Sequence, residues 1–461
     1  MRFKRDKFLG LGILHCFESI GVLLIGQESP RFGIFELMTS SHPYWPAPQG
    51  QNINATVALP GSKSLTNREL LLSAIASAPT LLIAPLVSRD SKLMISALKS
   101  LGIEFAWQGK DLLVTPKPLL GPATIDCGLA GTVMRFVPPL SMLASGEIAF
   151  DGDEGARRRP MHTTIDSIRA LGIKVSADSH SLPFTVHGTG RVLGGELSID
   201  ASSSSQFVSG LLLVAAKFER GLTLRHTGEE LPSLPHIEMT LETLRQRGVD
   251  AKTIDERTWR VEPGEIAGGR KVIEPDLSNA GPFLAAAMVA GGTVRIPNWP
   301  KVTTQVGAEF ERILPMMGAK CLVEDEVLTI HGDGNIHGID IDLSIGGELA
   351  PVIAALAALA DTPSRITGIA HLRGHETDRL SALTRELNNL GGDVSELEDG
   401  LEIRPATLHG GKWQSYEDHR MATAGAILGL RIPRLEVENI ATTSKTMPEF
   451  TKLWQDMLDA K

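Results

Sequence analysis

Cysteine is scarce in this sequence: Cys16, Cys127 and Cys321 are the only three among 461 residues. An odd number at wide spacings excludes a disulfide framework and a zinc site built on cysteines. The same pattern is typical of proteins that work in a reducing compartment. We therefore expect a cytoplasmic protein.

Aromatic residues are also few, at 5%, and the chain has no excess of positive charge, since its formal net charge is −9. Proteins that bind nucleic acids through the phosphates carry a basic excess, so we expect no nucleic-acid partner. If the ligands are anions, the cations that bind them must be gathered locally in a cleft.

The sequence lacks a long uninterrupted hydrophobic run. An apolar stretch at residues 8–25 follows a basic start, but His15 and Glu18 interrupt it and no small-x-small cleavage site follows. It is also short for a membrane span, so we expect neither a signal peptide nor a membrane segment. Our hypothesis is that translation starts at Met38. Mass spectrometry of the native N-terminus tests this, and a peptide from residues 8–30 would contradict it.

The stretch PGSKSLTNRE at residues 60–69 follows a β-prone segment and leads into an apolar run. Thr66 and Glu69 have the spacing of a capping box, which predicts a helix that begins near Leu65 or Thr66. The spacing of the glycine and lysine is not that of a nucleotide-binding P-loop, so nucleoside triphosphates are not indicated.

Lys63, Ser64 and Arg68 would surround the start of this helix. Free backbone N–H groups and the helix dipole favour an anion at such a position. On this stretch alone, a helix start with incidental charge is an equally good interpretation.

From Ala55 onward the chain repeats one unit. One half of the unit is an amphipathic helix that ends at a glycine and is followed by two strands. The helix-closing glycines recur about 70–76 residues apart, at Gly102, Gly172, Gly248, Gly318 and Gly391. The other half is a small-residue turn, a very apolar helix and a strand, at residues 61–77, 128–144, 202–217, 278–290, 346–360 and 416–430.

The six apolar helices are hydrophobic all round, which predicts that they are buried. We expect six βαβαββ units in two α/β domains. Residues 60–273 would form the first domain, residues 48–59 with 274–461 the second, and residues 1–47 an extension outside the repeats. A cleft between two domains is the default place for a ligand.

Polar residues gather at the starts of the apolar helices and in the loops near them. They are Gly131 with Arg135, Arg159, the serines 202–205 with Gln206, Ser233, Glu348, the charged cluster 371–379, Arg420 and Lys445. Each has a plain alternative, such as a flexible serine loop, an ordinary helix cap or a salt-bridged surface. Because similar positions in successive units carry them, we favour a cleft lined by helix starts that binds anions.

The motifs PGSKSLTNR, LAGTVMR, an Arg-Arg-Pro loop, SSSSQF, GHETDR, YEDHRM and TSKTMP occur in this order. Over about residues 50–458 the sequence thereby resembles the 5-enolpyruvylshikimate-3-phosphate synthase family. The resemblance implies two inside-out α/β domains, each of three βαβαββ repeats, with the active site in the interdomain cleft. It also implies transfer of the enolpyruvyl group of phosphoenolpyruvate to the 5-hydroxyl of 3-phosphoshikimate, with release of phosphate, in the shikimate pathway.

The resemblance implies roles for individual residues. Those expected to bind 3-phosphoshikimate are Lys63, Ser64, Arg68, Ser204, Ser205, Gln206, Ser233, Glu348 and His375. Those expected to bind phosphoenolpyruvate are Lys63, Gly131, Arg159, Gln206, Arg379, Arg420 and Lys445. Glu348 and Glu376 would be the acid–base pair, with Lys63 as a third catalytic group. No metal or organic cofactor is implied, and we expect a monomer.

Three positions depart from the family's common pattern. Glu348 stands where an aspartate is common, His375 where a lysine often precedes the glutamate, and Phe136 where a proline is frequent. The charge of a histidine depends on pH, so His375 is not a fixed cation.

Two alternatives are a UDP-N-acetylglucosamine enolpyruvyl transferase and a non-catalytic protein that binds phosphometabolites. The first has a Lys-Asn pair and a reactive loop cysteine, whereas this chain has Lys63-Ser64 and no cysteine at residues 151–160. The second gains nothing from two carboxylates among its cations.

Overall fold

The computed structural model describes residues 44–229, 231 and 233–460, so the predicted start at Met38 lies outside the described residues. Five sheets of four strands share one plan, in which a parallel pair is followed by an antiparallel hairpin. Each of these sheets contains the four strands of one βαβαββ unit, so the predicted repeat is present.

Three of these sheets belong to the first half of the chain. They are β14-β3-β5-β4 (Gly269–Val272, Thr80–Ile83, Asp111–Thr115, Glu104–Gln108), β6-β7-β9-β8 (Ala123–Asp126, Ser145–Asp151, Phe184–Thr189, Val175–Ala177) and β10-β11-β13-β12 (Gly195–Ile199, Leu222–His226, Thr258–Val261, Ala251–Asp255). Two belong to the second half: β2-β15-β17-β16 (Ile53–Thr56, Gly292–Pro297, Val327–Gly332, Lys320–Glu324) and β18-β19-β21-β20 (Asp340–Asp342, Ser364–Thr367, Leu401–Arg404, Asp393–Glu396).

The sixth sheet has three strands, β1 (Tyr44–Pro46), β23 (Glu436–Glu438) and β22 (Lys412–Trp413). Here β1 pairs antiparallel with β23, where the other units have their hairpin. Trp45 packs against the neighbouring core. Residues 44–46 therefore belong to the sixth sheet, whereas the expected extension ends at residue 47.

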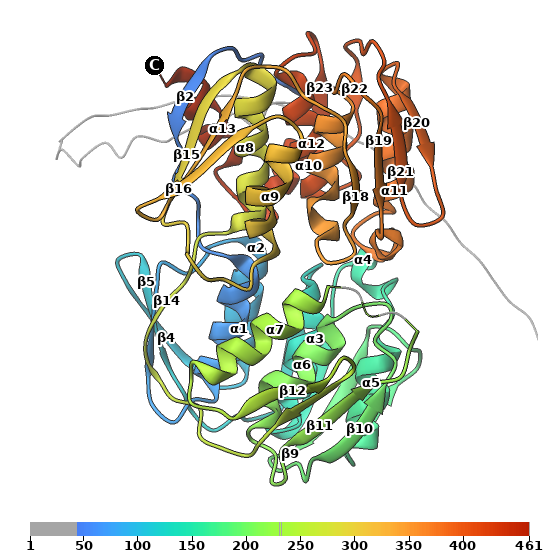
Figure 1. Cartoon of the computed structure of the whole chain (residues 1–461). Helices are drawn as coiled ribbons and strands as arrows, with labels where there is room; N and C mark the ends of the chain where they lie inside the picture. The colour runs from blue at the N-terminus through green and yellow to red at the C-terminus, as the bar shows by residue number, and fades with distance from the viewer. Residues whose placement is uncertain (1–43, 230, 232, 461) are drawn as a thin grey trace, which may run out of the picture. The chain divides into compact units, whose positions relative to one another are not determined.

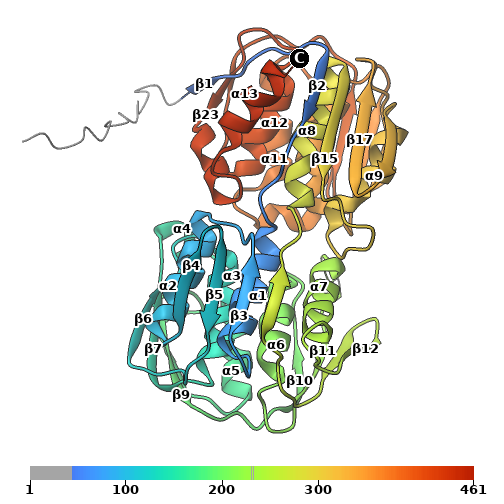
Figure 2. The ribbon, with the colours of Figure 1, turned by 90° about the vertical axis from the view of Figure 1, so that its left-hand side faces the viewer.

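The predicted apolar helices form the centre of the fold. They are α1 (Lys63–Ala74), α3 (Gly131–Ser141), α6 (Gln206–Ala215), α8 (Leu277–Ala290), α10 (Ala350–Ala357) and α12 (His419–Gly429). Nearly every residue of these helices is buried, as predicted. The first three form one group and the last three another, with the sheets outside them (Figure 1, Figure 2).

The amphipathic helices are α2 (Arg89–Ser100), α5 (His162–Ala170), α7 (Leu234–Arg245), α9 (Phe310–Met316), α11 (Arg379–Asn389) and α13 (Phe450–Asp459). The five predicted closing glycines have φ between 81° and 106°. This conformation suits glycine at a helix C-terminus and confirms the prediction. Short elements complete the list: α4 (Glu154–Arg157), η1 (Val306–Glu309), η2 (Gly347–Leu349), η3 (Ala370–Gly374) and η4 (Ile440–Lys445).

Two hydrophobic cores define two lobes within residues 44–460. The first lobe's core draws on residues from Leu70 to Ile266, and the second's on Ala47 to Val57 and Leu277 to Met457. The chain crosses between them twice. Strand β2 comes before the first lobe but pairs with β15 of the second, and Figure 1 shows it, in blue, among yellow and red elements. Strand β14 ends the first lobe and pairs with β3 at its beginning.

The predicted capping box at Thr66 and Glu69 is wrong. Helix α1 begins at Lys63, and the hydroxyl of Ser62 accepts a hydrogen bond from the backbone N–H of Leu65. Thr66 instead accepts from the N–H of Leu86, and Glu69 forms a buried ion pair with Arg247. The earlier start puts Lys63 and Ser64 in the first turn of the helix.

Among the helices of residues 44–229 and 233–460, none is long and apolar enough to cross a membrane.

Candidate functional site

A polar cavity of about 110 Å³ lies where the starts of helices from both lobes meet. Its walls include residues from the first turns of α1, α3, α6, α8, α11 and α12, and from η2 before α10. The prediction that several helix starts face one space is therefore confirmed. The helix dipoles add to a positive potential there.

Most predicted site residues lie in or beside this cavity. Those that line it are Lys63, Ser64, Gln206, Glu348, His375, Glu376, Arg379 and Arg420. Lys445 contacts Glu376, and Gly131 and Arg159 lie next to Gln206. Arg68 lies one turn further along α1. Ser204, Ser205 and Ser233 are not among the described residues that line the cavity.

Glu348 lies at the meeting of the two lobes. Its Oε1 accepts hydrogen bonds from Ser278 Oγ at 2.5 Å and from Arg420 Nη2 at 3.2 Å. Its Oε2 lies 3.3 Å from Nε2 of His236, which belongs to helix α7 of the first lobe. Burial opposes ionisation, but Arg420 and His236 hold the pKa of Glu348 well below its ordinary value. This carboxylate is therefore ionised, which is the form that can accept a proton.

Glu376 is held by two cations. The ammonium group of Lys445 contacts its Oε1, and Arg379 Nη2 donates to Oε2 at 3.0 Å. Burial again opposes ionisation, but Lys445 and Arg379 place the pKa of Glu376 well below its ordinary value. Arg379 is itself fixed by a two-point contact with the buried Asp418, at 2.8 and 3.2 Å.

Lys63 has a weaker partner. Its Nζ lies 3.8 Å from Asp90 Oδ2, and its backbone N–H donates to Asp276 Oδ2 across the lobes at 3.1 Å. Burial lowers the pKa of Lys63, and the like charges of Lys445 and Arg420 lower it further. The ammonium group is thus more acidic than a lysine in water and can give up a proton more easily.

Arg68 serves as an internal brace in this structure. Its guanidinium donates to Thr240 Oγ1 at 2.9 Å, to the carbonyl of His236 at 2.8 Å and to that of Ser64 at 3.0 Å. Burial lowers the pKa of Arg68 to about 9. Its side chain fixes the backbone of His236 and thereby the ring that meets Glu348.

A second group of cations surrounds Gly131. A Cβ atom added at Gly131 would lie 3.1 Å from Gln206 Oε1 and 3.3 Å from the guanidinium nitrogens of Arg135 and Arg159. The Nε atoms of both arginines are buried without a hydrogen-bond partner among the described residues. Buried donors are nearly always paired, so these two N–H groups indicate a site for an anion.

Sequence reasoning gave no role to three residues that shape this site: Ser278, His236 and Asp418. Ser278 is at a predicted helix start, Asp418 lies inside a quoted motif and His236 follows the predicted Ser233 by three residues, so the signal was proximity in sequence to assigned residues. Which carboxylate or cation each one meets depends on contacts between residues 39 to 112 positions apart, which a local pattern does not reveal.

Comparisons with known proteins agree with this geometry. A family model described as EPSP synthase (3-phosphoshikimate 1-carboxyvinyltransferase) matches residues 48–454. The chain is 56% identical over 431 residues to a 3-phosphoshikimate 1-carboxyvinyltransferase of Kocuria rhizophila, covering 90% of this chain and 97% of that protein.

Solved structures show the same fold. A 2.37 Å structure of EPSP synthase from Acinetobacter baumannii superposes with a TM-score of 0.77 at 24% identity, over 90% of this chain and 98% of that one. A second structure of an EPSP synthase from this organism gives 0.75 at 24% identity, over 89% and 97%.

Proposed function

The chain belongs to the EPSP synthase (3-phosphoshikimate 1-carboxyvinyltransferase) family, and from this premise we propose that the cavity between the helix starts is its active site. The enzyme transfers the enolpyruvyl group of phosphoenolpyruvate to the 5-hydroxyl of 3-phosphoshikimate and releases phosphate, a step of the shikimate pathway. The assignment of residues to each part of this reaction is our proposal.

The observation that carries the proposal is the pairing of two buried carboxylates with cationic partners in one cavity. Glu348 and Glu376 both have pKa values well below the ordinary range, and their partners include Arg420 and Lys445. A protein that only binds anions gains nothing from carboxylates among its cations. An enzyme that moves protons needs them.

Phosphoenolpyruvate is assigned to the cations around Gly131. Arg135 and Arg159 have free N–H groups there, and an arginine fork matches the oxygens of a phosphate or carboxylate. Arg379, Arg420 and Lys445 would complete this site. Arg420 and Lys445 contact protein carboxylates, so phosphoenolpyruvate would compete with Glu348 and Glu376 for them.

3-Phosphoshikimate is assigned to the first lobe, where hydroxyl groups and helix starts can bind its phosphate. Ser64 lines the cavity, and Ser204, Ser205 and Ser233 lie at or just before the starts of α6 and α7. The last three would take part when the substrate extends beyond the cavity. Gln206 would lie between the two ligands, and Glu348 would meet the 5-hydroxyl. His375, which hydrogen-bonds Arg379, would bind as a neutral ring because burial holds its pKa well below the ordinary value.

In the addition step, Glu348 removes the proton of the 5-hydroxyl while the hydroxyl oxygen attacks C2 of phosphoenolpyruvate. The methylene carbon of phosphoenolpyruvate gains a proton. In the elimination step, the new methyl group loses a proton and phosphate leaves. Lys63 is a suitable donor of the proton that the methylene carbon gains, because its pKa is lowered. Glu376 takes up a proton only after Lys445 turns to phosphoenolpyruvate, since the loss of that partner raises its pKa.

The finer organisation of the molecule is also proposed. Residues 60–273 and residues 48–59 with 274–461 would be domains that close on the substrates and exclude water. The pairing of β2 with β15 and of β14 with β3 supports these boundaries. We propose a cytoplasmic monomer, because three scattered cysteines suit a reducing compartment and the closure of two domains of one chain needs no partner.

Substitution of the two carboxylates tests the proposed roles. Glu348→Gln and Glu376→Gln keep the shape of each side chain but remove the base. We expect each to lower kcat by about 100-fold or more, with only modest changes in KM. Steady-state kinetics with both substrates varied measures this. A change confined to KM would mean that the residue only binds.

A further inference from the structure

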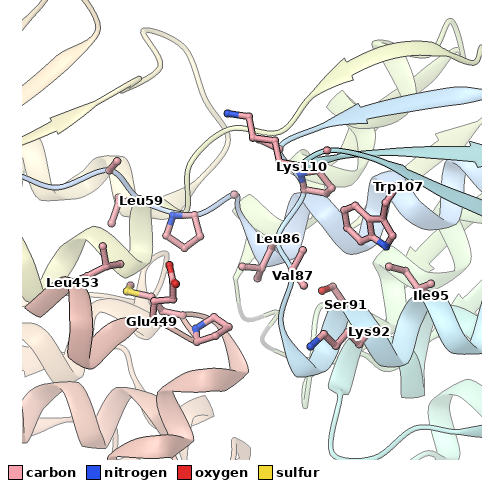
Figure 3. Close-up of a pocket in the computed structure, with 18 of the residues that line it drawn as sticks. Leu59, Leu86, Val87, Ser91, Lys92, Ile95, Trp107, Lys110, Glu449 and Leu453 are labelled. Atoms are coloured by element: carbon pink, nitrogen blue, oxygen red, sulfur yellow. The ribbon is translucent and has the colours of Figure 1, made fainter. Parts of the chain in front are cut away.

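A second and larger hollow lies behind the active-site cavity. It has a volume of about 1040 Å³ and is lined by the crossover at residues 59–61, by α2 and the β4–β5 turn of the first lobe, and by residues 447–453 of the second. We call it the crossover groove. Figure 3 shows Leu59 and Leu453 on one side of it and Trp107 and Ile95 on the other.

The floor and far wall of the groove are apolar and partly open to solvent. Trp107 is 48% exposed and Val87 is 45% exposed, and both line the groove. By contrast, Trp259, Trp299, Trp413 and Trp454 are at most 2% exposed. An exposed indole beside aliphatic side chains offers a flat surface on which an aromatic ring can stack.

The charges around this apolar surface are mostly positive. Lys92, Lys99 and Lys110 line the groove, and Glu449 is the single carboxylate among its lining residues. Lys99 lies over the ring of Phe105, at 6.0 Å from its centre. No ion pair within the described residues involves Lys92 or Lys110, so their charges are available to a ligand. This local excess occurs on a chain whose net charge is −9.

We propose that the crossover groove is a binding site for a small aromatic carboxylate, whose ring lies on Trp107 and whose charge is met by Lys92 and Lys110. Its volume is that of sites for ligands of drug-like size. An apolar floor with a cationic rim suits this class better than a polyphosphate, which would need more cations and no apolar surface.

The groove shares its wall with the active site. Gly61 lies two residues before Lys63, Ser91 follows the Asp90 that pairs with Lys63, and Met447 lies two residues after Lys445. The groove exists in the arrangement in which both lysines pair with protein carboxylates, so a ligand that fits it favours that arrangement. This part rests on the proposed function: the ligand should raise KM for phosphoenolpyruvate, because that substrate binds better when those pairs are broken.

Calorimetric titration with naphthalene-2-carboxylate tests the binding site, with excess inorganic phosphate present to occupy the cationic cavity. We expect Lys92→Gln/Lys110→Gln to weaken binding about tenfold, as expected for two screened charge contacts. The control pair Lys174→Gln/Lys301→Gln removes two exposed charges elsewhere and should bind like the unaltered chain. Trp107→Ala should weaken binding, whereas Trp107→Phe should largely retain it. The neutral naphthalene-2-carboxamide should bind weakly to all variants.

Three results would overturn the proposal. They are absence of binding to the unaltered chain, equal affinity of the two double variants, and equal affinity for the carboxylate and the carboxamide. If sedimentation shows a dimer that Trp107→Ala dissociates, a second copy occupies the groove and the proposal also fails. Failure of the catalytic assignments would leave these binding results unchanged, so the two proposals are tested separately.

Discussion

At the scale of single residues, the proposed active site is a set of buried charges that pair with one another, and substrate would replace some of these partners. Arg420 and Lys445 are paired with Glu348 and Glu376, whereas the Nε groups of Arg135 and Arg159 lack partners within the described chain. The paired cations can move to a ligand at low cost, because one anion is exchanged for another.

Gly131 provides the space for that ligand. In Gly131→Ala, the added methyl group would lie 3.1–3.3 Å from Gln206 and from two guanidinium groups, which is tighter than ordinary contact. We expect KM for phosphoenolpyruvate to rise about tenfold, the effect of mild overpacking, while KM for 3-phosphoshikimate changes little. Steady-state kinetics with each substrate varied in turn checks this. Equal changes in both KM values would contradict the assignment of Gly131 to phosphoenolpyruvate.

His236 tunes Glu348 from the opposite lobe. Its hydrogen bond helps to lower the pKa of Glu348, and the proposed base would act in its ionised form. In His236→Leu this pKa should rise, so activity should be lost at a higher pH as the solution is acidified. His236→Gln keeps a hydrogen-bond donor and should shift the profile less.

The acid limb of kcat/KM against pH measures this effect. A loss of rate in His236→Leu that is the same at every pH would show that the residue has only a structural role.

The sequence predicts the role of a residue where the charge or hydrogen-bonding groups of its side chain suggest that role directly. Lys63, Glu348, Glu376 and Arg420 were predicted and lie at the cavity. His236 and Asp418 were not, because their use depends on partners brought close by the fold. Arg68 shows the converse: its hydrogen bonds go to Thr240, Ser209 and two backbone carbonyls, and its contact with substrate stays a prediction.

At the scale of elements, helix starts decide where the charges lie. The start of α1 shows how local patterns can mislead, since Thr66 and Glu69 match a capping box but are used otherwise. Ser62 is an equally good cap by composition, and tertiary contacts of Glu69 decide between them. By contrast, the closing glycines were predicted correctly because a left-handed helix end strongly favours glycine.

The Glu69–Arg247 pair fastens α1 to the segment that follows α7. Arg247 is fully buried and also donates to Ser73 and to the carbonyl of Ala267, at 2.8 and 2.9 Å. In Glu69→Gln the guanidinium loses its buried counter-charge, so we expect unfolding free energy to fall by about 3–5 kcal/mol. Urea unfolding measures it.

The exposed pair of Arg158 with Glu154 supplies the control, since Arg158→Gln should change stability by less than about 1 kcal/mol. If the two variants lose equal stability, the buried pair is not a structural fastening.

At the scale of the whole molecule, a repeat of about 70 residues predicts six units, and their sheets follow one plan except the last. Strand β1 closes the sixth sheet, and this was not predictable because pairing at a sheet edge has little sequence signature. The two crossings occur at turn-forming segments, residues 59–61 and 272–276. The structure alone shows that β2 pairs with β15 and β14 with β3, although the paired strands lie far apart in the sequence.

The most direct test of the central claim is the release of phosphate from phosphoenolpyruvate, measured with and without 3-phosphoshikimate. We predict no release without the second substrate, because Glu348 then has no hydroxyl to activate. With both substrates the unaltered chain should release phosphate steadily, and Glu348→Gln should be slower by about 100-fold or more. Release that proceeds without 3-phosphoshikimate, or that Glu348→Gln leaves unchanged, would contradict the proposed active site.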